Sequence, residues 1–226
     1  MAPLLAVRRT PPPPPWSGPS VDLRGVSVRT PEGVLLAPVS LRVERGETVA
    51  VTGPNGSGKT TLLRVVAGLL RPTAGSAVVA GHPADERSGR HRRAVAALVQ
   101  APPFERDLTL EEHLAMVAVS WGEGVAQARA RAEQGLDALG LTPLGRRFPH
   151  ELSSGQTQLF SLALVLARPS EVLLLDEPEQ RLDSDRVPLV ARVLREASAH
   201  RAVLVATHSP VIVEAVATRV LELGRP

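Results

Sequence analysis

Hydrophobic and polar residues alternate along two stretches in the first quarter of the chain. They are residues 21–30 (VDLRGVSVRT) and 40–53 (SLRVERGETVAVTG). An alternation of period two turns one face of a strand inward and the other toward solvent, so the pattern predicts half-buried strands. Residues 75–81 (GSAVVAG), an apolar run between glycines, predict a third strand.

Longer apolar runs and helical spacing follow in alternation. Strands are predicted at 94–100 (AVAALVQ), 171–178 (EVLLLDEP) and 202–208 (AVLVATH), the last two fully buried. Helices are predicted at 60–72, which ends at Pro72, and at 109–140, 157–167 and 187–199. Thr109 and Glu112 have the spacing of a capping box. Buried strands alternating with helices indicate an α/β fold, a mostly parallel sheet flanked by helices on both faces.

Residues 1–20 are expected to lie outside the globular fold, which begins at Val21. Their five consecutive prolines, 11–15, donate no backbone hydrogen bond and favour an extended conformation. We expect this tail to be disordered or to serve as a flexible docking arm. Its apolar residues are too few, and precede the arginines, so a signal peptide is not expected.

Composition excludes several classes of protein. With no cysteine, disulfides, thiol catalysis and thiolate metal sites are excluded, which fits a cytoplasmic protein. The most apolar region, residues 161–178, is interrupted by Arg168, Pro169 and Glu171, so no membrane-spanning helix is expected. The pI of 10.7 follows from a net charge of only +3 in a chain without tyrosine or cysteine. We therefore favour a bias in composition over a basic face for nucleic acid or anionic lipid, and 2% aromatic residues disfavour base stacking.

Residues 53–60, GPNGSGKT, match the phosphate-binding loop pattern G-x-x-x-x-G-K-[S/T] and lie between a predicted strand and a predicted helix. Glycines let the backbone amides turn toward phosphate oxygens, and the helix adds its positive N-terminal end. Lys59, the only lysine in the chain, would reach the β- and γ-phosphates, and the Thr60 hydroxyl would bind Mg²⁺. The predicted nucleotide-binding residues are Gly53, Pro54, Asn55, Gly56, Ser57, Gly58, Lys59, Thr60 and Thr61. The alternative is a glycine-rich turn with a surface lysine.

Two further elements point to the same chemistry. The predicted strand at 172–176 delivers Asp176, which would hold Mg²⁺, followed by Glu177, which would orient or deprotonate the attacking water. Alone this is a weak signal, because acidic residues often end strands. The element LSSGQ at 152–156 is by itself a capping box, with Ser153 at the cap and Gln156 three residues later.

Taken together, the phosphate loop, Gln100, LSSGQ, the strand ending in DEP and the later Thr207-His208 resemble ATP-binding cassette (ABC) ATPases. Their order and separations match from Val21 to nearly the end of the chain. The resemblance implies a P-loop NTPase fold in residues 21–226, with an antiparallel β subdomain and a helical subdomain at about 101–165. It also implies ATP and Mg²⁺ as ligands.

The family pattern also assigns roles across a pair of chains. Two cassettes pack head to tail, so that one chain's phosphate loop and the other's signature element enclose each ATP. The signature residues Ser153, Ser154, Gly155 and Gln156 would contact the partner's nucleotide, and Asp183 would communicate across the dimer. Gln100 would meet Mg²⁺ and sense the membrane partner, and His208 would hold the γ-phosphate and the attacking water. The catalytic residues implied are Glu177, His208 and Lys59; the metal-binding residues are Thr60, Gln100 and Asp176.

Three positions depart from the family pattern. No aromatic residue lies near Thr30 to stack on adenine. Trp16 is the candidate for this stacking role in its place. Ser154 replaces the commoner glycine, and EQR at 179–181 replaces small residues before Asp183. None of these changes removes a catalytic group.

The function expected is therefore that of an ATPase subunit of an ABC transporter. Its partners would be separate integral-membrane subunits, contacted near Gln100 and residues 101–114, and a second ABC chain in a homodimer or heterodimer. No nucleic-acid partner is expected, and the protein would lie in the cytoplasm at the inner face of the membrane. The alternatives are a soluble ABC-type ATPase acting on a ribosome, DNA or another machine, and a nucleotide-binding regulator. The transported substrate and its direction are left open.

Overall fold

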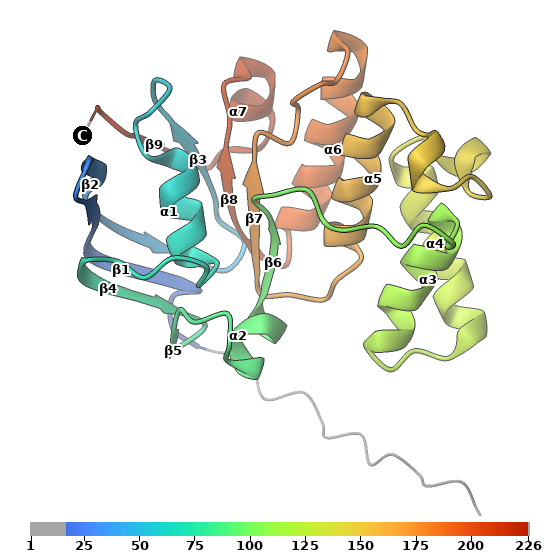
Figure 1. Ribbon diagram of the computed structural model, residues 1–226, viewed down its shortest axis with the longest axis horizontal. Coiled ribbons are helices and arrows are strands. Elements are labelled where there is room, and N and C mark those ends of the chain that lie inside the picture. The colour runs from blue at the N-terminus through green and yellow to red at the C-terminus, as the bar shows by residue number, and fades with distance from the viewer. Residues whose placement is uncertain (1–16, 226) are drawn as a thin grey trace, which may run out of the picture.

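Two β-sheets of different kinds organise the protein (Figure 1). The computed structural model describes residues 17–225. Most of the predicted tail at 1–20, and with it Trp16, lies outside the described residues. The first strand of the described residues, β1, begins at Val21.

The first sheet is antiparallel and has the strand order β2-β1-β4-β5. Its strands are β1 (Val21–Thr30), β2 (Gly33–Val43), β4 (Ala74–Val79) and β5 (His82–Pro83). The second sheet has the order β6-β7-β8-β3-β9, and every neighbouring pair in it is parallel. Its strands are β3 (Thr48–Thr52), β6 (Val95–Leu98), β7 (Val172–Asp176), β8 (Ala202–Ala206) and β9 (Arg219–Glu222). The predicted parallel sheet with an antiparallel β subdomain is confirmed.

Helices cover both faces of the parallel sheet. They are α1 (Lys59–Val66), α2 (Gly89–Ala94), α3 (Leu110–Ser120), α4 (Val125–Ala138), α5 (Ser154–Leu166), α6 (Val187–Ser198) and α7 (Pro210–Val216). Short 3₁₀ turns are η1 (Thr142–Leu144), η2 (Pro149–Glu151) and η3 (Ser184–Arg186). Figure 1 shows α3 and α4 at the end of the molecule opposite the antiparallel sheet. With α5 they fall within 101–165, and we keep that range as the proposed helical subdomain.

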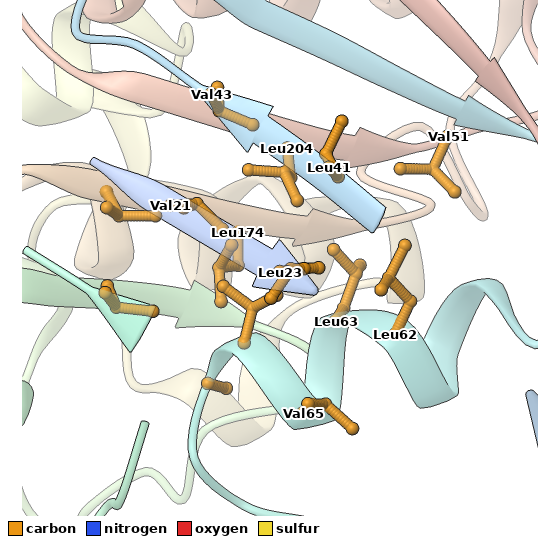
Figure 2. Close-up of a cluster of buried hydrophobic side chains, with 14 of the residues drawn as sticks. Val21, Leu23, Leu41, Val43, Val51, Leu62, Leu63, Val65, Leu174 and Leu204 are labelled. Atoms are coloured by element: carbon orange, nitrogen blue, oxygen red, sulfur yellow. The ribbon is translucent and has the colours of Figure 1, made fainter. Parts of the chain in front are cut away.

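Strand β7 shows how the sheet is buried on both sides. Leu174 belongs to the cluster between the two sheets, where Leu62 and Leu63 of α1 point toward Leu23 of β1 (Figure 2). The neighbouring residues of β7, Leu173 and Leu175, belong to the second cluster, on the side of α5 and α6. A strand with no solvent face needs an uninterrupted apolar run, which is the pattern found at Val172–Leu175.

Three of the predicted elements are divided or shortened by a turn in the structure. Helix α1 ends at Val66, six residues before Pro72, because Gly68 turns the chain with a φ of 74°, and a Cβ there would lie 2.6 Å from the Glu86 amide nitrogen. The helical region 109–140 is split into α3 and α4, and Gly122, with a φ of 90°, lies in the break.

The predicted strand at 40–53 is the third case. It is divided by a turn at 45–46 into the end of β2 and all of β3. Residues 48–51 of β3 are buried on both faces, so the interpretation of this part as half-buried is wrong. The polar residue Thr48 makes this stretch of the sequence look like alternating polar and apolar positions. In the structure, Thr48 and the residues after it lie inside the central sheet.

Candidate nucleotide site

The carboxyl ends of three adjacent parallel strands meet at one edge of the sheet. Strands β7, β8 and β3 are neighbours in that order, and Asp176 pairs with Ala206 while Val51 pairs with it from the other side. The segments that follow these strands are therefore close: the loop 53–58 after β3, Glu177 after β7, and His208 after β8. This edge of an α/β sheet is where ligands usually bind.

The loop 53–58 is held tightly by its glycines. Gly53 has a φ of 138°, and a Cβ there would lie 2.3 Å from the Leu223 carbonyl oxygen. Gly58 has a φ of 95°, and a Cβ there would lie 2.6 Å from the Leu35 carbonyl oxygen. Both positions thus require glycine for conformation and for space. Pro54, Asn55 and Gly56, at the crest of the loop, carry the predicted backbone turn before α1 begins at Lys59.

Lys59 lies beneath the loop rather than on the surface. It is 6% exposed, and its Nζ donates hydrogen bonds to the carbonyl oxygens of Gly53 (2.9 Å) and Pro54 (3.2 Å). Ser57 is 2% exposed, and its hydroxyl has no hydrogen-bond partner among the described residues. The buried ammonium of Lys59 and the unpartnered hydroxyl of Ser57 lie under a glycine-rich loop, and together they form a site that fits phosphate oxygens. The structure therefore disagrees with the alternative of a surface lysine.

Thr60 and Asp176 are in direct contact. The Thr60 hydroxyl donates to Asp176 Oδ2 at 2.7 Å, which joins the first turn of α1 to the last residue of β7. No group of three or more His, Cys, Asp or Glu side chains within 17–225 is placed to hold a metal by itself. One hydroxyl and one carboxylate beside a phosphate loop suit Mg²⁺, which is usually held by few protein ligands together with phosphate oxygens and water. The structure thus brings together two of the residues for which a metal role was predicted.

Glu177 is held by contacts on each side of its carboxylate. Its Oε1 lies 3.5 Å from His208 Nε2, and its Oε2 accepts a hydrogen bond from Gln180 Nε2 at 3.1 Å. Its backbone N–H donates to the Ala206 carbonyl at 2.8 Å, and its φ of 47° is uncommon for a residue other than glycine. Strained backbone of this kind persists only where the surroundings hold it, and here the hydrogen bond to Ala206 does so.

The remaining predicted residues lie around this centre. Gln100 is exposed and follows β6, where Leu98 pairs with Leu175, so it lies beyond the sheet edge next to the end of β7. Thr61 is half-buried in the first turn of α1. Thr30 ends β1, and its hydroxyl donates to the Gly33 carbonyl in the hairpin turn. Asp183 is exposed and precedes η3.

The element 152–156 is not brought to the phosphate loop of its own chain. Ser153 caps α5: its hydroxyl accepts from the Gln156 N–H at 3.3 Å, and its own N–H donates to Gln156 Oε1 at 2.9 Å. Figure 1 shows the start of α5 well separated from the start of α1, with β7 and β8 between them. Ser154 is exposed, while a Cβ on Gly155 would lie 2.9 Å from the Arg181 carbonyl oxygen.

Helix α5 also contacts the segment that carries Glu177. The side chain of Gln158 donates to the carbonyl oxygens of Glu177 (3.4 Å) and Pro178 (3.3 Å). Sequence reasoning missed this residue, and it missed Gln180 and Glu179 as partners of the site. The family pattern usually has small residues at positions 179 and 180. The polar residues found there were the one sign in the sequence that these side chains take part in the site.

A family model described as ABC transporter matches residues 36–180, which is more than half of the chain. The chain belongs to the ABC transporter family.

Proteins of this family cover nearly the whole chain. An ABC transporter ATP-binding protein of Streptomyces avermitilis is 40% identical over 195 residues, covering 85% of this chain and 74% of the relative. The energy-coupling factor transporter ATP-binding protein EcfA of Methanothermobacter thermautotrophicus is 32% identical, over 90% of this chain and 68% of its own length. A solved dimeric ATP-binding cassette in a post-hydrolysis state with ADP and Pi is 25% identical, with a TM-score of 0.80 and coverage of 90% and 94%.

These findings identify the chain as an ABC ATPase of the transporter class and confirm the P-loop NTPase fold. The matched region contains the loop 53–60, Gln100, the LSSGQ element and Glu177, and it ends before His208. Among residues 17–225, no helix of this ABC ATPase combines the length and apolar character that crossing a bilayer requires.

Proposed function

We propose that this chain binds Mg²⁺ and ATP at the loop 53–60 and hydrolyses the nucleotide to drive transport through separate membrane subunits. The observation that carries the proposal is the meeting of the loop, the Thr60–Asp176 contact and the Glu177–His208 pair at one edge of the parallel sheet. Each of these parts is common alone, but together they supply phosphate binding, metal binding and water activation.

The binding half of the site consists of backbone and two charged groups. Amides of residues 53–58 and the N-terminal end of α1 hold the phosphates, and Lys59 adds its positive charge from below. Thr60, Asp176 and Gln100 are the residues that would hold Mg²⁺. When bound, the metal neutralises charge on the phosphate oxygens.

The hydrolytic half consists of Glu177 and His208. Glu177 accepts a proton from the attacking water or orients it, since its carboxylate lies at the strand edge and is held on both sides. His208 stabilises the γ-phosphate and the water from the end of β8. Both side chains are partly exposed, 32% and 47%, so a substrate can reach them from the solvent side.

A second ABC chain completes the site in this proposal. Ser153, Ser154, Gly155 and Gln156 form the N-terminal end of α5, which lies well separated from the chain's own loop, and such an end attracts anions. The relative bound to ADP and Pi is dimeric. We propose that two copies, or this chain and a close relative, pack so that each start of α5 faces the other's phosphate loop, with Asp183 near the contact.

The membrane subunits are proposed to contact the segment 101–114 and the exposed face of α3. Met116 and Val119 of α3 are 48% and 46% exposed, which is unusual for large apolar side chains. Gln100 lies at the start of this segment, so contact there would reach the metal site directly. In this proposal the protein works at the inner face of the membrane.

The test is the variant Glu177→Gln. It retains the size and the hydrogen bond from Gln180 but removes the base, so it should bind ATP as the parent protein does and lose on the order of 10²–10⁴ in turnover. The matched control is Glu196→Gln, an exposed glutamate on α6, which should leave turnover unchanged. Near-normal phosphate release by the Glu177→Gln protein would refute the proposed role of Glu177.

A further inference from the structure

The side chain of Glu179 joins the loop after β7 to the loop after β8. Its Oε1 accepts hydrogen bonds from the Thr207 hydroxyl and from the His208 backbone N–H, the latter at 3.2 Å. Thr207 is fully buried, and its Oγ1 also accepts from the Ser209 N–H at 2.9 Å. The backbone of three consecutive residues, 207–209, is thus fixed through one carboxylate.

This fixed backbone determines where His208 points. The imidazole is 47% exposed, and its recorded polar contact is the one between Nε2 and Glu177 Oε1. A fixed backbone sets the direction of the Cα–Cβ bond of His208, which leaves only the χ1 and χ2 rotamers to decide where the imidazole lies. The peptide N–H of His208 is one of the groups that Glu179 binds, so the anchor is as close to the histidine as a backbone contact allows.

We propose that Glu179 is a positioning residue for ATP hydrolysis, which aims His208 at Glu177 by fixing residues 207–209. The inference rests on the proposed function for the roles of Glu177 and His208. Glu179 does not act on the substrate itself, because both groups bound by its Oε1 belong to the loop after β8. Its effect passes through His208 alone.

A long side chain with a terminal oxygen is required at this position. The carboxylate spans from the loop after β7 to the loop after β8, and its Oε2 is buried with no hydrogen-bond partner among residues 17–225. The small residues that the family pattern usually has before Asp183 lack this reach. The positioning contact therefore depends on two residues of this chain, a glutamate at position 179 and a threonine at position 207.

The first experiment compares two substitutions at position 179. Glu179→Ala removes both hydrogen bonds, so kcat should fall about 10- to 100-fold, the usual cost of misplacing a catalytic group by about 1 Å. The dissociation constant for ATP should stay within about twofold, since Lys59 and the loop 53–58 are untouched. Glu179→Gln keeps a carbonyl oxygen for Thr207 and His208 and should recover most of the turnover.

Glu47→Ala is the matched control. Glu47 is also half-buried and accepts a backbone N–H, that of Glu44 at 2.9 Å, but it lies at the opposite edge of the sheet, just before β3. Its loss should lower the midpoint of thermal unfolding without changing kcat. Should Glu179→Ala fail to fold, Thr207→Val serves instead: it removes the buried hydroxyl and keeps the side-chain shape, and kcat should again fall while ATP affinity is retained.

The second experiment tests whether Glu179 acts through His208. In a His208→Ala background, adding Glu179→Ala should slow turnover no further, because the side chain that Glu179 aims is already absent. The inference is overturned if Glu179→Ala is as fast as the parent protein, or if the two losses multiply. If His208→Ala and Glu177→Gln both keep full turnover, the proposed function fails as well, and this outcome differs from the failure of the positioning role alone.

Discussion

Thr60 and Asp176 are separated by 116 positions in the sequence, yet the hydroxyl of one donates to the carboxylate of the other at 2.7 Å. The contact joins the start of α1 to the end of β7. It depends on the order of strands in the parallel sheet, in which only β8 lies between β7 and β3. In the proposed function, these two residues supply oxygen ligands to Mg²⁺.

This pair makes metal dependence a direct test. Asp176→Asn should keep the fold and the hydrogen bond from Thr60 but lose the negative charge, so turnover should fall by about 100-fold or more. Magnesium titrations of phosphate release should also need higher metal concentrations. Asp137→Asn, an exposed aspartate on α4, is the control and should behave as the parent protein. Equal magnesium requirements for both variants would contradict the assignment of Asp176.

Lys59→Arg tests why a chain rich in arginine retains one lysine. The lysine is 6% exposed and its Nζ has two carbonyl partners within 3.2 Å, so a planar guanidinium has no equivalent room. ATP affinity measured by calorimetry should weaken at least about tenfold, or about 1.4 kcal/mol. The opposite exchange at the exposed Arg64 of α1, Arg64→Lys, should change nothing. Parent-like affinity in Lys59→Arg would show that the charge alone matters.

Mixing variants tests the composite site. Ser154→Glu places a negative charge at the first turn of α5, where it favours the helix but repels a triphosphate. Homodimers of Ser154→Glu and of Lys59→Ala should both be inactive, but a mixture should regain part of the turnover, because a mixed pair has one intact site. Mixing Lys59→Ala with Glu177→Gln should regain none, since both defects lie on the same side of the site. Full activity of Ser154→Glu alone would contradict the proposed pairing.

His91 makes stability depend on pH near neutrality. The side chain is 2% exposed, and burial lowers its pKa below the ordinary 6.5, opposed in part by the Ala67 backbone and the charge of Asp85. The unfolded chain therefore takes up the proton first. The contribution of neutral His91 to the free energy of unfolding should be complete above about pH 6.5. It should fall as the pH is lowered toward the pKa of the folded state, by about 1.4 kcal/mol for each unit by which the two pKa values differ.

Urea unfolding at pH 7.5 and 5.5 measures this effect. His91→Gln should lose much of the difference between the two pH values, while the exposed His200→Gln should retain it. Carboxylates with lowered pKa values, such as Asp85 and Glu151, contribute only at more acidic pH. A difference that persists in His91→Gln would assign the pH dependence to another group.

The binding loop and the buried strands were predictable from the sequence because their signals are local. The glycines of 53–58, the capping box at Thr109, and the apolar run of β7 each require only neighbouring residues to be recognised. The end of α1 was not, because Pro72 is the stronger local signal, while Gly68 breaks the helix through its approach to the backbone of Glu86.

The contacts that complete the candidate site needed the three-dimensional structure. Glu179 reaches Thr207 across 28 positions, and Gln158 reaches Glu177 across 19. Neither pair has a spacing that a helix or strand pattern would reveal, because each depends on the packing of α5 and on the neighbouring positions of β7 and β8. The polar residues at 179 and 180 were visible, but their partners were not.

The solitary lysine under the glycine loop has a practical consequence. An acylating reagent can modify only one side-chain amine in this polypeptide, and that amine is Nζ of Lys59. The other basic side chains are guanidinium and imidazole groups, which form no stable amide, so the α-amine of the chain is the other group that such a reagent labels. Protection of this single atom, followed by mass spectrometry, would therefore report occupancy of the loop 53–58 directly, with no engineered probe.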